Sequence, residues 1–146
     1  MKVYLDVCSL QRPLDSMTHT RIVLEAEAVL GVLRLCETGQ VELIASEALE
    51  FELGRNPNEV RREFAMRALS KAVQFIPASE RVEKRARELN RVGFRPLDAL
   101  HVASAEAAGA DYFCTCDDPL LKRAKAVRGL KVKPVSPVEL VGEIER

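Results

Sequence analysis

The sequence predicts an α/β fold, a three-layer sandwich in which a mostly parallel central sheet of about five strands lies between two layers of helices. Short segments rich in Val, Ile, Tyr and Phe alternate with segments whose apolar residues recur at helical spacing, and this alternation is typical of βαβ units. The chain has 146 residues, of which 47% are hydrophobic. A chain of this length buries roughly 68 to 70% of the surface that it exposes when unfolded, so one core suffices and we expect a single domain over residues 1–146.

The first half of the chain contains two units of a strand followed by a helix. Residues 2–7 are rich in Val, Tyr and Leu and predict the first strand, which leads into a loop. Apolar residues at helical spacing predict a helix over 22–37. Residues 41–45 predict the second strand, after which Ser46 can cap a helix that finishes near Gly54.

The second half continues the alternation with three strands and five helices. In chain order they are a helix over 58–73, a strand over 73–76, a helix from Val82 to Gly93, a helix over 96–108, a strand over 111–116, a helix over 120–127 with Asp118 as N-cap, a strand over 130–135, and a last helix that begins with a capping box of Ser136 and Glu139. Since strands and helices alternate to the end, we expect helices to cover both faces of the sheet.

Composition and charge exclude several classes of protein. The 22 Lys and Arg residues balance 22 Asp and Glu residues, which argues against a generally basic surface for nucleic acids but leaves room for a local basic rim. No apolar run comes near the roughly 20 residues of a membrane span, and Asp6 interrupts the region where a signal peptide needs apolar length. We therefore expect a cytoplasmic protein that does not bind a membrane.

The four cysteines lack the paired spacing of a zinc site. Because cytosolic cysteines are usually reduced, we expect four free thiols that serve as small buried hydrophobic side chains. The alternative is a redox contact between Cys8 and the 111–116 strand, where Cys114 and Cys116 share one face.

Carboxylates gather where ligands bind in such a sheet, at the carboxyl ends of the strands. They are Asp6 at the end of the first strand, Glu47, Glu50 and Glu52 in the helix after the second strand, Asp98 in the first turn of the 96–108 helix, and Asp117 and Asp118 after the fourth strand. Each acid taken singly has a structural explanation, such as capping a helix. Together they would repel one another unless a divalent cation neutralises them, and an all-oxygen donor set favours Mg²⁺ or Mn²⁺ over zinc.

Three of these acids lie in segments that form a pattern: Val-Tyr-Leu-Asp at 3–6, Pro-Leu-Asp-Ala-Leu-His-Val-Ala-Ser-Ala at 96–105, and Cys-Thr-Cys-Asp-Asp at 114–118. In this order they resemble the PIN-domain nuclease family, most closely its small single-domain VapC-like group. The resemblance spans essentially the whole chain, and the segment around Asp98 is its most specific part. It implies a PIN-like fold in which Asp6, Asp98 and Asp117 bind metal.

The resemblance also implies a glutamate in this cluster. Glu50 and Glu52 lie about 200° apart around their helix, so at most one of them faces a metal, and periodicity does not choose between them or exclude Glu47. The resemblance favours Glu52. It also matches Thr115 to a hydroxyl residue of the family, whereas Cys8 stands where the family often has Ser, Thr or Asn.

Such a site implies a Mg²⁺- or Mn²⁺-dependent endoribonuclease. A carboxylate-held ion lowers the pKa of a bound water and neutralises charge during in-line displacement at a phosphodiester, so no side-chain nucleophile is required. His101 could act as a general base, but we prefer to interpret it as a half-buried packing residue that hydrogen-bonds locally. Substrate contacts are expected from Thr115 and from the basic residues nearest the acids in the sequence, which are Arg12, Arg55, Arg95 and Lys122. The resemblance further implies an RNA substrate, a homodimer, and a small antitoxin protein as partner.

Other functions compete with this hypothesis. A PIN-like module that binds RNA or a protein without cleaving is the main alternative, and the presence of all the expected acids argues against it. A phospho-receiver would need an acceptor Asp after the 73–76 strand, where residues 77–79 contain none. A haloacid-dehalogenase-type phosphatase would need a second Asp two residues after Asp6, where the chain has Cys8.

Overall fold

Five parallel strands form one central sheet in the computed structural model, which describes residues 1–146. Their order across the sheet is β3-β2-β1-β4-β5, and every neighbouring pair is parallel. The strands are β1 (Lys2–Leu5), β2 (Glu42–Ser46), β3 (Gln74–Ile76), β4 (Tyr112–Cys114) and β5 (Lys133–Val135). The predicted α/β class and the number of strands are confirmed, and the sheet is wholly parallel.

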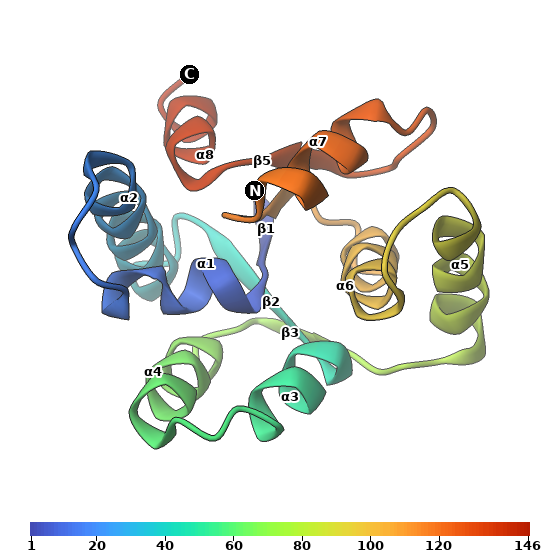
Figure 1. The fold of residues 1–146 in the computed structure, drawn as a ribbon, viewed down its shortest axis with the longest axis horizontal. Helices are drawn as coiled ribbons and strands as arrows, with labels where there is room; N and C mark the ends of the chain where they lie inside the picture. The colour runs from blue at the N-terminus through green and yellow to red at the C-terminus, as the bar shows by residue number, and fades with distance from the viewer.

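Helices cover both faces of this sheet (Figure 1). On one side lie α2 (Thr20–Glu37) and α8 (Pro137–Ile144), and on the other α6 (Pro96–Ala107) with α5 (Glu80–Arg91) packed outside it. The remaining helical elements are α1 (Val7–Gln11), the 3₁₀ turn η1 (Arg12–Leu14), α3 (Glu47–Gly54), α4 (Glu59–Leu69) and α7 (Asp118–Ala126). None of the helices combines the length and the apolar composition that a bilayer span requires.

The central strand β1 is the most deeply buried part of the core. Val3, Tyr4 and Leu5 have no exposed surface, because a parallel sheet with helices on both faces removes both sides of its strands from water. Val3 pairs with Leu43 of β2 on one side, and Tyr4 pairs with Phe113 of β4 on the other. The rings of Tyr4 and Phe113 stack with centroids 5.6 Å apart.

The structure corrects the prediction for the segment after β1. Residues 7–11 form α1 and residues 12–14 form η1, where the sequence predicts a loop. Asp6 ends the strand and caps α1, since its Oδ1 accepts a hydrogen bond from the Ser9 N–H at 3.0 Å. A helix of five residues is too short to show apolar periodicity, so the pattern could not reveal it.

The start of α7 also differs from the prediction. Asp117, and not Asp118, is the N-cap, because its Oδ1 accepts from the Leu120 N–H at 3.1 Å. Asp118 instead receives two hydrogen bonds from the Arg21 guanidinium, at 2.5 and 2.7 Å. The predicted capping box of the last helix is confirmed at Ser136 and Glu139.

Candidate active site at the carboxyl ends of the central strands

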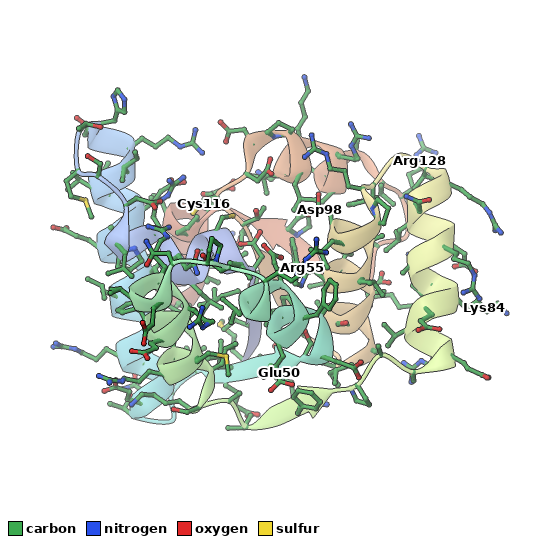
Figure 2. All side chains as sticks on the ribbon, turned by 60° about the horizontal axis from the view of Figure 1, so that its bottom comes forward. Glu50, Arg55, Lys84, Asp98, Cys116 and Arg128 are labelled. Carbon is green, nitrogen blue, oxygen red and sulfur yellow. The ribbon has the colours of Figure 1, made fainter.

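The topology brings four of the predicted acids to one edge of the sheet. Because β2, β1 and β4 are adjacent and parallel, their carboxyl ends meet there. The acids arrive at this edge from different elements: Asp6 directly after β1, Glu52 on α3 after β2, Asp117 after β4, and Asp98 in the first turn of α6. Figure 2 shows Asp98, Cys116 and Arg55 around this edge, with Glu50 away from it on the side of β3.

Asp6 is the most deeply buried of these acids, with 6% of its surface exposed. Burial raises the pKa of its carboxyl above the usual value, and the Thr115 hydroxyl, the Cys8 thiol and the Ser9 N–H partly oppose that rise. The thiol of Cys8 donates to Oδ1 at 3.1 Å and lies 3.3 Å from Oδ2. Burial therefore makes ionisation of Asp6 more costly than in a free aspartate, and these three donors offset part of that cost.

Asp98 and Asp117 line a small pocket of about 170 Å³ together with Arg95 and Arg123. Burial raises the pKa of Asp98. The charges of Asp117 and Asp6 raise it further, while His101 and Arg95 oppose the rise. Asp6 and Asp117 are thus close enough to Asp98 for their charges to add to the cost of ionising it.

Thr115 links two of these aspartates from inside the core. It has no exposed surface, and its Oγ1 accepts the Asp117 backbone N–H at 3.0 Å and lies 3.5 Å from the Cys8 Sγ. The structure thus places the Thr115 hydroxyl between Asp117 and the Asp6 carboxyl, whose pKa it lowers. This placement suits the orientation of carboxylates better than the substrate contact that the sequence suggests.

Glu52 lies at the edge of a larger cleft of about 580 Å³ and is held by His101. The Nε2 atom of His101 lies 2.7 Å from Oε1 of Glu52, and its Nδ1 lies 2.7 Å from the Tyr4 hydroxyl. The interpretation of His101 as a half-buried residue with local hydrogen bonds is wrong. It is only 2% exposed, and its partners are 49 and 97 residues away in the sequence.

The two other glutamates of α3 face elsewhere. Glu47 accepts a hydrogen bond from the Ala78 backbone N–H at 3.1 Å. Glu50 lines a separate cleft beside β3 with Met66 and Phe75. Of the three candidates, only Glu52 lines the cleft to which Cys8 and Leu97 contribute, close in the sequence to Asp6 and Asp98, and its role stays a prediction.

The sequence profile of the PIN domain family matches residues 3–126, a stretch that includes all four acids. The chain belongs to the PIN domain family. Its fold is similar to that of a chain in the crystal structure of VapBC2 from Rickettsia felis, bound to a DNA fragment from their promoter. The TM-score is 0.60 over 93% of this chain and 98% of that chain, at 12% identity, so this likeness concerns the fold. A comparison with curated proteins gives no match.

Basic side chains line both the larger cleft and the smaller pocket. Only some of them are among those that the sequence predicts. Arg55 lines the larger cleft and Arg95 the smaller pocket. Arg12 is committed to ion pairs, with Asp15 at 2.8 Å and Glu25 at 3.0 Å. Lys122 is exposed and lines neither hollow.

Arg123 is the basic residue of this PIN domain that the sequence analysis missed. It lines the pocket with Asp98 and Asp117, and its guanidinium donates to the Gly93 carbonyl. Gly93 has a φ of +108°, which favours glycine, and a Cβ added there would lie 2.6 Å from Nη1 of Arg123, so a side chain at this position would displace the end of Arg123. Arg123 stands one helical turn after the buried Leu120, and this spacing could have placed it toward the pocket.

The four cysteines of the PIN domain are unpaired. Cys36, Cys114 and Cys116 are buried, as predicted for small hydrophobic side chains, whereas Cys8 is half-buried beside Asp6. Its thiol donates a hydrogen bond to the Asp6 carboxylate and is therefore one of the groups that orient this carboxylate.

The donors at this edge suit a hard divalent cation, because all four acids offer oxygen and burial makes the charges of Asp6 and Asp98 costly. No three His, Cys, Asp or Glu side chains lie close enough together to hold one ion in the present conformation. Binding of an ion by three of these acids therefore requires their side chains to move closer to one another.

Proposed function

We propose that this PIN domain is an endoribonuclease that uses Mg²⁺ or Mn²⁺ at Asp6, Asp98, Asp117 and Glu52. The observation that carries the proposal is the convergence of three aspartates at one edge of the sheet, where burial raises the pKa of Asp6 and of Asp98 and the charges of Asp117 and Asp6 raise that of Asp98 further. Such a cluster costs folding free energy, and a divalent cation would offset that cost. Membership of a family of nucleases supports phosphodiester hydrolysis as the reaction.

When bound, a Mg²⁺ or Mn²⁺ ion supplies an acidified water and neutralises charge on the phosphodiester oxygens. The chain holds the carboxylates for that ion. The Ser9 N–H orients Asp6, the Leu120 N–H orients Asp117, and the first turn of α6 directs Asp98 into the same pocket. Each aspartate thus lies at a helix N-terminus, whose dipole favours the ionised form that a metal requires.

The basic rim is suited to a phosphate chain. Arg95 and Arg123 stand beside the aspartates, and Arg55 stands beside Glu52 in the larger cleft. Guanidinium groups bind phosphate oxygens in a fork geometry, and a few such contacts give affinity without a basic protein overall. The larger cleft, at about 580 Å³, has room for a nucleotide next to Glu52.

We propose RNA as the substrate, and the toxin of a toxin–antitoxin pair as the biological role. The similarity of the fold to a chain of VapBC2 supports a small antitoxin protein as partner. We propose a homodimer as the assembly. Apolar side chains on the surface of α3 and β3, among them Phe51 and Phe75, are 54% and 49% exposed and offer area for such contacts. Light scattering of the purified chain, alone and with the product of a neighbouring small gene, tests both statements.

The activity is tested with purified protein and end-labelled single-stranded RNA. We expect cleavage with Mn²⁺ or Mg²⁺, none with EDTA, and none with the Asp98→Asn variant, which keeps the shape of the side chain and removes its charge. RNA that is bound but not cleaved with either ion would instead support the non-catalytic module. Cleavage that persists in EDTA would contradict a metal-dependent mechanism.

A further inference from the structure

A chain of hydrogen bonds runs from the core to Glu52. The Ser46 Oγ lies 2.6 Å from the Tyr4 hydroxyl, which lies 2.7 Å from Nδ1 of His101, whose Nε2 lies 2.7 Å from Oε1 of Glu52. Ser46, Tyr4 and His101 are at most 2% exposed, whereas the Glu52 side chain is 36% exposed at the cleft. A buried, continuous polar chain that ends on one carboxylate is costly unless every member is satisfied.

The groups at the two ends of this chain decide which partner donates in each hydrogen bond. Glu52 as a carboxylate can only accept, so Nε2 of His101 carries a proton and, in the neutral imidazole, Nδ1 accepts. The Tyr4 hydroxyl then donates to Nδ1 and accepts from the Ser46 hydroxyl. Ser46 in turn accepts the Leu49 N–H at 3.1 Å. In this arrangement each buried donor has one acceptor.

We propose that His101 is a positioning residue, which holds the Glu52 carboxylate at the cleft in one orientation and is itself held in the Nε2–H tautomer by Tyr4 and Ser46. This inference rests on the proposed function, which makes Glu52 part of the metal site. A free glutamate side chain at the surface samples many rotamers, and ordering it costs entropy at the moment of metal binding. The bond from His101 orders Oε1 in advance and leaves Oε2 without a protein partner.

Ser46 connects the orientation of Glu52 to the position of its helix. The same hydroxyl that completes the chain through Tyr4 is the N-cap of α3, the helix that carries Glu52. The Ser46 hydroxyl at the end of β2 therefore helps to fix both the helix that carries Glu52 and, through Tyr4 and His101, the side chain of Glu52. His101 has no nitrogen left for a proton from the cleft, since both are engaged within the protein. A general-base role for His101 does not fit this arrangement.

The tautomer is tested in the metal-free protein by ¹⁵N NMR of the imidazole groups at neutral pH. The chain contains only two histidines, and His19 is exposed without a side-chain hydrogen bond, so the His19→Asn variant leaves a single imidazole signal set. We expect a proton on Nε2 and a hydrogen-bonded acceptor at Nδ1. A single proton on Nδ1, or protons on both nitrogens, would overturn the proposed direction of the chain.

The positioning role is tested by titrating each purified variant with Mn²⁺ and measuring the free ion by electron paramagnetic resonance. Loss of a partner that orients a metal ligand typically weakens metal binding about 10- to 100-fold. We expect this loss in His101→Leu. In His101→Gln an amide can still donate to Glu52 and accept from Tyr4, so affinity should largely recover. This rescue would not occur if His101 served only to fill space.

A matched pair of tyrosine variants controls for the removal of a hydrogen-bonded tyrosine hydroxyl. Tyr4→Phe breaks the chain between Ser46 and His101, whereas Tyr112→Phe removes a hydroxyl that binds Glu143 on α8. We expect weaker Mn²⁺ binding in Tyr4→Phe and no change in Tyr112→Phe. Wild-type Mn²⁺ affinity in both Tyr4→Phe and His101→Leu would overturn the proposal. Neither the NMR nor the Mn²⁺ measurement uses RNA, so a protein that binds Mn²⁺ as expected but cleaves no RNA would contradict the proposed function alone.

Discussion

The thiol of Cys8 lies 3.1 Å from Oδ1 and 3.3 Å from Oδ2 of Asp6, so the most deeply buried carboxylate of the site has a sulfur donor across both of its oxygens. Cys8 follows Asp6 by two residues in the first turn of α1. A thiol is a weaker donor than a hydroxyl or an amide. The pKa of Asp6 is therefore raised by burial and only partly lowered by its donors.

Replacement of Cys8 should move the pH dependence of activity. Cys8→Ala removes a group that lowers the pKa of Asp6, so we expect that pKa to rise and the acid limb of the cleavage profile to shift to higher pH. Cys8→Ser keeps a donor, and its profile should match that of the wild type or lie at lower pH. The measurement is the rate of Mn²⁺-dependent RNA cleavage against pH, with Cys36→Ala on α2 as the control thiol. Identical profiles for Cys8→Ala and the wild type would show that this contact has no influence.

Removal of single charges from the cluster should not destabilise the metal-free protein. Burial raises the pKa of Asp6 and Asp98 in the folded protein above the ordinary value of 3.8, so the unfolded chain releases these protons first as pH rises. The native state therefore binds more protons, and the free energy of unfolding falls as pH rises through the interval above 3.8. The Asp6→Asn and Asp98→Asn variants each lack one of these titrating carboxyls, so its contribution to the fall in the free energy of unfolding disappears. We expect their melting temperatures at pH 7 to equal or exceed that of the wild type by a few degrees, while cleavage falls to the level seen in EDTA. A large drop in the melting temperature of Asp98→Asn would reassign that residue to folding.

Metal binding should appear as a gain in stability. An ion that binds only the native state at 100 times its dissociation constant adds about 2.7 kcal/mol to the free energy of unfolding. We expect millimolar Mn²⁺ to raise the melting temperature of the wild type and to leave that of Asp6→Asn almost unchanged, as followed by calorimetry. Equal increases in the two proteins would indicate binding at other surface groups.

The three glutamates of α3 should separate in a parallel series. We expect Glu52→Gln to lose Mn²⁺-dependent cleavage, because Glu52 faces the cleft beside the aspartates. Glu50→Gln and Glu47→Gln should keep activity within about a factor of two, since these side chains face β3 and the Ala78 N–H. Activity that survives in Glu52→Gln and disappears in either of the others would reverse the assignment.

Arg123 should contribute more to RNA affinity than its neighbour Lys122. Arg123 lines the pocket of Asp98 and Asp117, whereas Lys122 does not. We expect Arg123→Ala to weaken RNA binding and to reduce the slope of the logarithm of affinity against the logarithm of salt concentration by about 1, as for one lost phosphate contact. Lys122→Ala should change neither quantity, as measured by fluorescence anisotropy between 50 and 200 mM salt. Equal effects of the two variants would mean that RNA follows another path across α7.

The sequence by itself determined the class of fold and the places of the three aspartates. Alternating strand and helix patterns require a parallel sheet with both faces covered, and the carboxyl ends of its neighbouring strands must then share one edge. Asp6 and Asp117 follow two such strands, so the sequence placed both at this edge, whereas the pairing of β1 with β4, which makes them neighbours, was decided by the folded sheet. The family pattern around Asp98 added the third acid, because the pattern depends on adjacent residues.

Only the tertiary structure decided how the side chains around these acids are held. The bond from His101 to Glu52 spans 49 residues and that from His101 to Tyr4 spans 97, so no local period could reveal them. The guanidinium of Arg123 packs against Gly93 and donates a hydrogen bond to its carbonyl, although Gly93 lies 30 residues earlier in the chain. Patterns in a sequence report which residues share a face of one element. Contacts between elements depend on packing, and packing set the partner of each polar group in this site.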